Sequence, residues 1–183
     1  MLDKAVGLIQ DKRIKKWVKN FLNDVTRPYF WVVPASSTGK YHNSGSAGQH
    51  GLVFHTKYAI FVAVDLVDNE LFDFTTEERD VIIAALILHD TFKYGRKKTK
   101  YTVAEHAVIA HEEVLNFDGG LPIEVREKIA ECILTHNGKW NTKWNSDEVI
   151  APKPSKKIQK FCHLADYLAS RKYIEFDEDK IDI

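Results

Sequence analysis

The segment AALILHDTFKYG, residues 84–95, decides how the fold of this chain is interpreted. Its apolar first half is typical of a buried helix, yet the apolar run ends in His89 and Asp90. A buried carboxylate is costly unless a positive group lies beside it. The rest of the chain must therefore supply, or bind, a positive partner for Asp90.

The composition is that of an ordinary soluble protein. The chain has 183 residues, of which 44% are hydrophobic and 28% charged, and this length favours one domain over residues 1–183. The longest apolar run, VIIAALIL, is too short to span a membrane, and the first 22 residues interleave charges with apolar residues, so we expect no signal peptide there. We therefore expect a cytoplasmic protein without a membrane partner, with Cys132 and Cys162 as reduced core residues. Basic and acidic residues balance at 26 each, which argues mildly against a long nucleic-acid footprint.

Apolar periodicity and helix-start signals predict an all-α bundle. An amphipathic helix over 3–25 is expected to pack on a core of about 34–172, and the Pro-bounded segment RPYFWVVPA to be extended. Thr75 with Glu78, and Thr102 with Glu105, resemble capping boxes. The core helices are expected at about 52–67, 75–88, 102–117, 122–136 and 155–172.

Six polar residues lie on the apolar faces of five of these predicted helices. They are His55, His89, Asp90, His106, His136 and Asp166. A single histidine on such a face is more often a core residue bonded to a backbone carbonyl, and Asp166 alone could pair with Arg171 or Lys172. Six separate desolvation costs, however, would be offset together by one or two shared divalent ions. Imidazole and carboxylate ligands without thiolate suit zinc, iron, manganese, cobalt, nickel or magnesium.

The order of these residues resembles the HD-domain metal-dependent phosphohydrolases. GLVFHT is similar to the segment around the first histidine of the family, LILHDTFKYG to its HD-and-lysine motif, and HLADYLASR to its final aspartate segment. SSTGKYHN resembles a loop that precedes the first histidine in some bacterial and phage members. The resemblance covers about residues 34–172 and implies a helical bundle with a metal site at its centre.

The resemblance also implies roles for individual residues. It makes His55, His89, Asp90 and Asp166 the ligands of a first metal. His106 and His136 would bind a second metal, with Asp90 as the bridge. Asp90 and Lys93 would be catalytic, and Lys93 would contact a substrate phosphate. The departure from the family lies at Thr91-Phe92, where many members carry a small residue before the lysine.

Further residues are candidates for substrate contacts. Arg96, in the basic run KYGRKKTK, could bind a phosphate or belong to a solvated loop. Lys40 and His42 lie in the polar loop before residue 52 and could reach the substrate or be merely exposed. Trp140 could stack on a nucleobase or pack as part of a lid.

The resemblance implies that the chain cleaves a phosphate ester of a small molecule by a metal-activated hydroxide, with a nucleotide as the favoured substrate. Three alternatives remain open from the sequence. The chain could be a nuclease acting on nucleic-acid ends, an oxygenase that holds two irons in the same six-ligand set, or a non-catalytic binding module whose metal stabilises the bundle.

Overall fold

The computed structural model describes residues 1–38, 44–177 and 181. Within these ranges the chain forms seven α-helices and two short 3-10 helices and no strand, which confirms the predicted all-α class. The α-helices are α1 (Asp3–Gly7), α2 (Lys12–Asp24), α3 (Gly51–Asp68), α4 (Thr76–Leu88), α5 (His106–Asn116), α6 (Ile123–Thr135) and α7 (Lys157–Ala169). The 3-10 helices are η1 (Pro28–Trp31) and η2 (Ser44–Ser46).

Helix α4 is the centre of the bundle. It begins at the predicted capping box, in which Glu78 N donates to Thr75 Oγ1 at 3.2 Å and Thr75 N donates to Glu78 Oε2 at 2.9 Å. All of its residues from Asp80 onward are buried, because its sequence is apolar on every side. It therefore contacts α1, α2, α3, α6 and α7, and its C-terminal end lies deep inside the protein.

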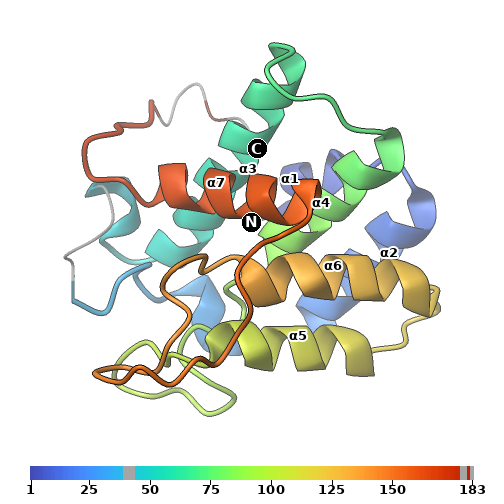
Figure 1. Cartoon of the computed structure of the whole chain (residues 1–183). Helices are drawn as coiled ribbons and strands as arrows, with labels where there is room; N and C mark the ends of the chain where they lie inside the picture. Colours follow the sequence, from blue (N-terminus) through green and yellow to red (C-terminus); the bar gives the residue numbers. More distant parts are fainter. Residues whose placement is uncertain (39–43, 178–180, 182–183) are drawn as a thin grey trace.

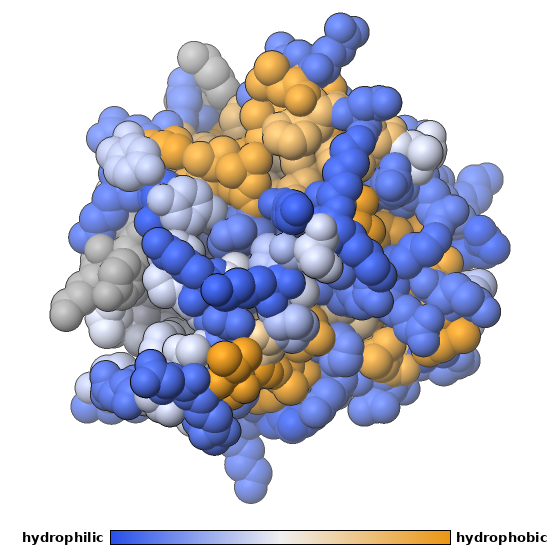
Figure 2. Space-filling model, in the orientation of Figure 1, coloured by the Kyte–Doolittle hydropathy of each residue, from blue (hydrophilic) through white to orange (hydrophobic). Residues whose placement is uncertain are grey.

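Five helices, α1, α2, α3, α6 and α7, pack around α4, and α5 packs on α6 (Figure 1). Helices α5 and α6 lie side by side, and α7 packs on both α3 and α6. In the view of Figure 2 the surface is mostly hydrophilic, with hydrophobic side chains gathered mainly in the upper part, near the end of α3 and the connection to α4, where Leu71 is 66% exposed. No helix within the described ranges is sufficiently long and apolar to cross a membrane.

The single helix predicted over residues 3–25 is wrong, because the chain breaks between α1 and α2. The buried carboxylate of Asp80 accepts hydrogen bonds from Gln10 N at 2.8 Å and Asp11 N at 2.7 Å. Asp11 then caps α2 by accepting from Arg13 N at 2.7 Å. A continuous helix would use these two amides internally and leave Asp80 buried without donors.

Three further boundaries differ from the predictions. The segment expected to be extended forms η1, with Pro28 at its start. Thr102 does not cap α5, which begins at His106; instead the Thr102 carbonyl accepts from Trp144 Nε1 at 3.3 Å. Helix α7 is shorter than predicted at both ends. The two cysteines are buried free thiols, as expected.

Candidate metal centre

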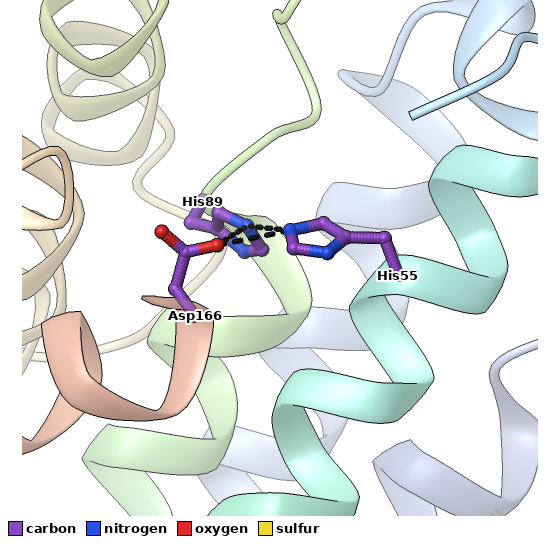
Figure 3. Close-up of side chains that lie close together, drawn as sticks. All are labelled: His55, His89 and Asp166. Carbon is purple, nitrogen blue, oxygen red and sulfur yellow. Dashed lines mark hydrogen bonds and ion pairs between the residues drawn. The ribbon is translucent and has the colours of Figure 1, made fainter. Parts of the chain in front are cut away.

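The six predicted ligands meet in the middle of the bundle. His55 comes from α3 and Asp166 from α7, and both point toward His89, the C-cap residue of α4 (Figure 3). His136 is the C-cap residue of α6, and His106 is the first residue of α5. Three of the four histidines therefore lie at helix ends, where the backbone turns away and the side chain can face inward. The described site is buried, and the side chain of Asp166 is its most exposed member at 17%.

Asp90 lies between two groups of histidines. Its Oδ2 is 3.3 Å from His89 Nε2 and 3.7 Å from His55 Nε2. Its Oδ1 is 3.3 Å from His106 Nε2 and 3.7 Å from His136 Nε2. The first group is completed by Asp166, whose Oδ1 is 2.9 Å from His55 Nε2 and 3.6 Å from His89 Nε2. The geometry thus contains two half-sites that share one carboxylate.

The orientation of the imidazole rings fits a bound cation. The Nδ1 atoms of His89, His106 and His136 lie 2.7, 2.8 and 2.6 Å from the carbonyl oxygens of Leu86, Val103 and Ile133. A carbonyl can only accept, so each Nδ1 donates its proton and each Nε2 faces the centre, where its lone pair can bind a metal when the ring is neutral. Burial lowers the pKa of His89, but Asp90 and Asp166 outweigh it and raise this pKa to about 10, so without a metal the His89 ring holds a second proton on Nε2. The Nε2 atoms of His106 and His136 are 3.1 Å apart, and those of His55 and His89 are 3.4 Å apart. Facing lone pairs repel, so a proton or a metal ion must lie between them.

Asp90 supplies a second observation of the same kind. Its Oδ1 is buried and has no hydrogen bond of normal geometry within the described part of the chain. Potential ligand atoms of His55, His89 and Asp166 lie within 4.8 Å of one another, as do those of His89, Asp90 and His136. A divalent ion would satisfy these atoms together, so the residues present fit a metal.

The electrostatics of the site favour anionic carboxylates. Burial opposes ionisation of Asp90, but Lys93 and His89 outweigh it and hold the pKa of this carboxyl well below its usual range. Burial likewise opposes ionisation of Asp166, and hydrogen bonds from His55 and His89 lower its pKa well below its usual range. Burial also lowers the pKa of His136 to about 3, which keeps this imidazole neutral and able to bind a metal.

Lys93, which was expected to contact a substrate phosphate, is largely buried and contacts the centre directly. Its Nζ donates directly to Asp90 Oδ2, and its side chain is 11% exposed. Thr91 and Phe92, the two residues that depart from the family pattern, are fully buried. Thr91 Oγ1 donates to Leu88 O at 2.7 Å and so helps to end α4 at the turn that presents Asp90.

The remaining predicted substrate contacts lie in different surroundings. Arg96 is exposed, and its guanidinium donates to Glu112 and Glu113 of α5, both at 2.7 Å. Trp140 is close to the ligand-bearing end of α6, where its ring packs on Tyr167. Lys40 and His42 lie outside the described residues.

Three residues near the centre received no firm role from sequence patterns. Tyr29 Oη donates to Gly95 O at 2.7 Å and accepts from Tyr94 N at 3.3 Å, so it holds the segment that follows the lysine; nothing in its local sequence indicated this. His163 Nδ1 lies 2.6 Å from His136 O, and its position three residues before Asp166 was the available signal. Arg171, considered only as a partner of Asp166, instead lies over the ring of Tyr167.

Comparisons with known proteins agree with this site. The model of one protein family, the HD domain, matches residues 53–171, which is more than half of the chain and includes all six candidate ligands. Searches of curated proteins and of solved structures each found no match.

Proposed function

The chain belongs to the HD-domain family, and on this premise we propose that it is a metal-dependent phosphohydrolase that cleaves a phosphate ester, with a nucleotide as the favoured substrate. One observation carries the proposal. Four imidazoles and two carboxylates from distant parts of the chain converge with their Nε2 and carboxylate oxygen atoms toward a common buried centre.

Two sets of residues would hold metal. His55, His89 and Asp166, with Asp90 Oδ2, would bind one divalent ion. His106 and His136, with Asp90 Oδ1, would bind a second. When bound, a divalent ion supplies Lewis acidity, which lowers the pKa of water from about 15.7 toward about 7 and polarises a phosphoryl oxygen. Oxygen and nitrogen donors admit manganese, iron, zinc, cobalt, nickel or magnesium.

The protein's own groups position and neutralise the substrate. Carbonyl contacts at Nδ1 fix the rings of His89, His106 and His136, so these side chains lose little entropy when they bind. The partial exposure of the Asp166 side chain supports an entrance beside this residue. With Asp90 engaged as a metal ligand, the Lys93 ammonium would be free to contact a substrate phosphate and to neutralise the charge that develops on it.

The test is a panel of nucleoside mono-, di- and triphosphates and cyclic dinucleotides, assayed for phosphate release with manganese, cobalt, nickel and zinc. We expect Asp90→Ala and His89→Ala to lose bound metal and turnover together, because Asp90 is the carboxylate that both half-sites share and His89 is a ligand of the first. His111→Ala, which changes a histidine of α5 outside the centre, is the matched control and should keep both. Turnover by Asp90→Ala at the parental rate would refute the mechanism.

Three further assays on the same protein separate the alternatives. Oxygen consumption by protein purified anaerobically with iron, without phosphate release, would indicate an oxygenase. Loss of folding on chelation, with no turnover of any phosphate ester, would indicate a module whose metal is structural. Release of nucleotides from nucleic-acid ends, with free nucleotides left intact, would indicate a nuclease.

A further inference from the structure

An aromatic group lies beside the metal centre on the connection that follows α6. The ring of Trp140 stacks on the ring of Tyr167, with centroids 5.9 Å apart and planes inclined by 16°. The guanidinium of Arg171 lies 4.1 Å from the Tyr167 centroid and 5.9 Å from the Trp140 centroid. These three residues are called the aromatic platform below.

The aromatic platform is joined to the ligands through short stretches of backbone. Tyr167 directly follows Asp166, and Trp140 is one turn of chain beyond His136. The ring of His163 contacts both His136 and Trp140: its Nδ1 is 2.6 Å from His136 O, and its centroid is 6.4 Å from the centroid of the Trp140 ring. The platform and the half-sites are therefore linked both along the chain and through the contact of His163 with His136.

Holding the connection in place does not require the Trp140 ring. Asn141 already ties this segment down, since its Nδ2 donates to Ala151 O at 2.6 Å and its carbonyl accepts from Ile150 N at 2.9 Å. Trp140 itself is 48% exposed, although burying an indole would stabilise the fold. An aromatic ring that remains about half exposed beside the metal centre, under the flexible side chain of Lys139, is available to a ligand.

The charge around the platform is positive. Arg171 donates to Tyr167 O at 3.1 Å and to Ser170 Oγ at 2.7 Å, but within the described ranges it forms no ion pair with a carboxylate. Lys139 Nζ lies 4.9 Å from the Trp140 centroid. Cations over a partly exposed aromatic ring suit a ligand that is both planar and anionic, because its base can take the place of the Lys139 side chain on the ring and its phosphate can pair with the charges.

We infer that Trp140, Tyr167 and Arg171 form a nucleobase subsite, so that a nucleotide binds with its base on the exposed Trp140 ring and its phosphate at the metal centre. This inference rests on the proposed function and narrows its substrate to nucleotides. Stacking on an aromatic ring tolerates every base, because each base has a π-face. The subsite should therefore discriminate strongly between nucleotides and phosphate esters that have no base, and only weakly between one base and another.

The test compares nucleoside 5′-monophosphates with ribose 5-phosphate, which keeps the phosphate and lacks the base. With manganese present, Trp140→Ala should lower kcat/KM for the nucleotides about 10- to 100-fold, mainly through KM, and leave ribose 5-phosphate unchanged. Trp140→Phe should restore most of the loss, and Arg171→Gln should also raise KM for the nucleotides. Trp144→Ala, at another exposed tryptophan, is the matched control and should behave like the parent.

Two results would overturn the subsite while the hydrolase stands. One is equal turnover of ribose 5-phosphate and the nucleotides by the parent, and the other is an equal loss for both substrates in Trp140→Ala. If no phosphate ester is hydrolysed, the proposed function fails and the subsite is judged by calorimetric titration of adenosine and guanosine monophosphates into manganese-loaded protein. Binding that weakens at least about 10-fold in Trp140→Ala supports it, and unchanged or absent binding overturns it.

Discussion

The Lys93–Asp90 ion pair gives a prediction that depends on whether a metal occupies the centre. With side chains 11% and 1% exposed, this is a buried pair, and the small values typical of surface pairs do not apply. Lys93→Met keeps most of the side-chain stem and removes the charge, which leaves a buried carboxylate without its closest cation. In protein treated with a chelator we expect the free energy of unfolding to fall by about 3–5 kcal/mol.

A bound divalent ion should remove most of this loss, because it neutralises Asp90 in place of the lysine. In saturating manganese we expect Lys93→Met to cost about 1 kcal/mol or less. The assay is urea unfolding at neutral pH, with chelator and with manganese, for the parent and the variant. In thermal unfolding, the loss in chelator corresponds to about 6–20 °C for a protein of this size.

Lys98→Met is the matched control, since Lys98 is exposed in the same basic run, and it should change stability little under either condition. An equal loss for Lys93→Met with and without manganese would refute the reasoning, because the metal would then not share Asp90 with the lysine. Turnover adds a separate readout: Lys93→Ala should keep bound metal and lose rate or substrate affinity.

The remaining predictions concern how the chain supports the centre. Gly138 has φ +58°, and a Cβ there would lie 2.3 Å from the His163 ring. At Gly120 φ is +78° but the space is open, so Gly120→Ala should cost only the backbone strain of about 1–2 kcal/mol. We therefore expect Gly138→Ala to destabilise the protein more than Gly120→Ala, and equal urea midpoints for the two variants would contradict this. Asp80→Ala removes the acceptor of two backbone amides and should cost roughly 3 kcal/mol, with faster amide hydrogen exchange at the α1–α2 break as the specific sign. Tyr29→Phe should cost about 1–3 kcal/mol at neutral pH. Burial raises the pKa of Tyr29 from 10 to about 12, so its contribution is complete below pH 10 and lost as the pH rises to about 12; the stability advantage of the parent over Tyr29→Phe should narrow across that window, and a constant difference would argue against it.

Local sequence signals predicted the elements that local physics controls. The capping box at Thr75 marked the start of α4, and the apolar periodicity of the later segments placed α3 and α6 within one or two residues of their bounds. Periodicity also indicated that the six candidate ligands face inward, because the face of a helix on which a residue lies follows from its spacing. These features depend on interactions within a few residues, so a sequence reports them directly.

Contacts between distant residues were decided by the tertiary structure alone. The break between α1 and α2 depends on Asp80, about 70 residues away in the chain, which a local pattern of alternating charged and apolar residues cannot reveal. The packing of Trp140 on Tyr167 depends likewise on how helix ends and loops turn in space. Sequence by itself determined which side chains the bundle must bury. The way in which the helices cross decided which of these side chains contact one another, because a buried charge pairs with the groups that packing brings close to it.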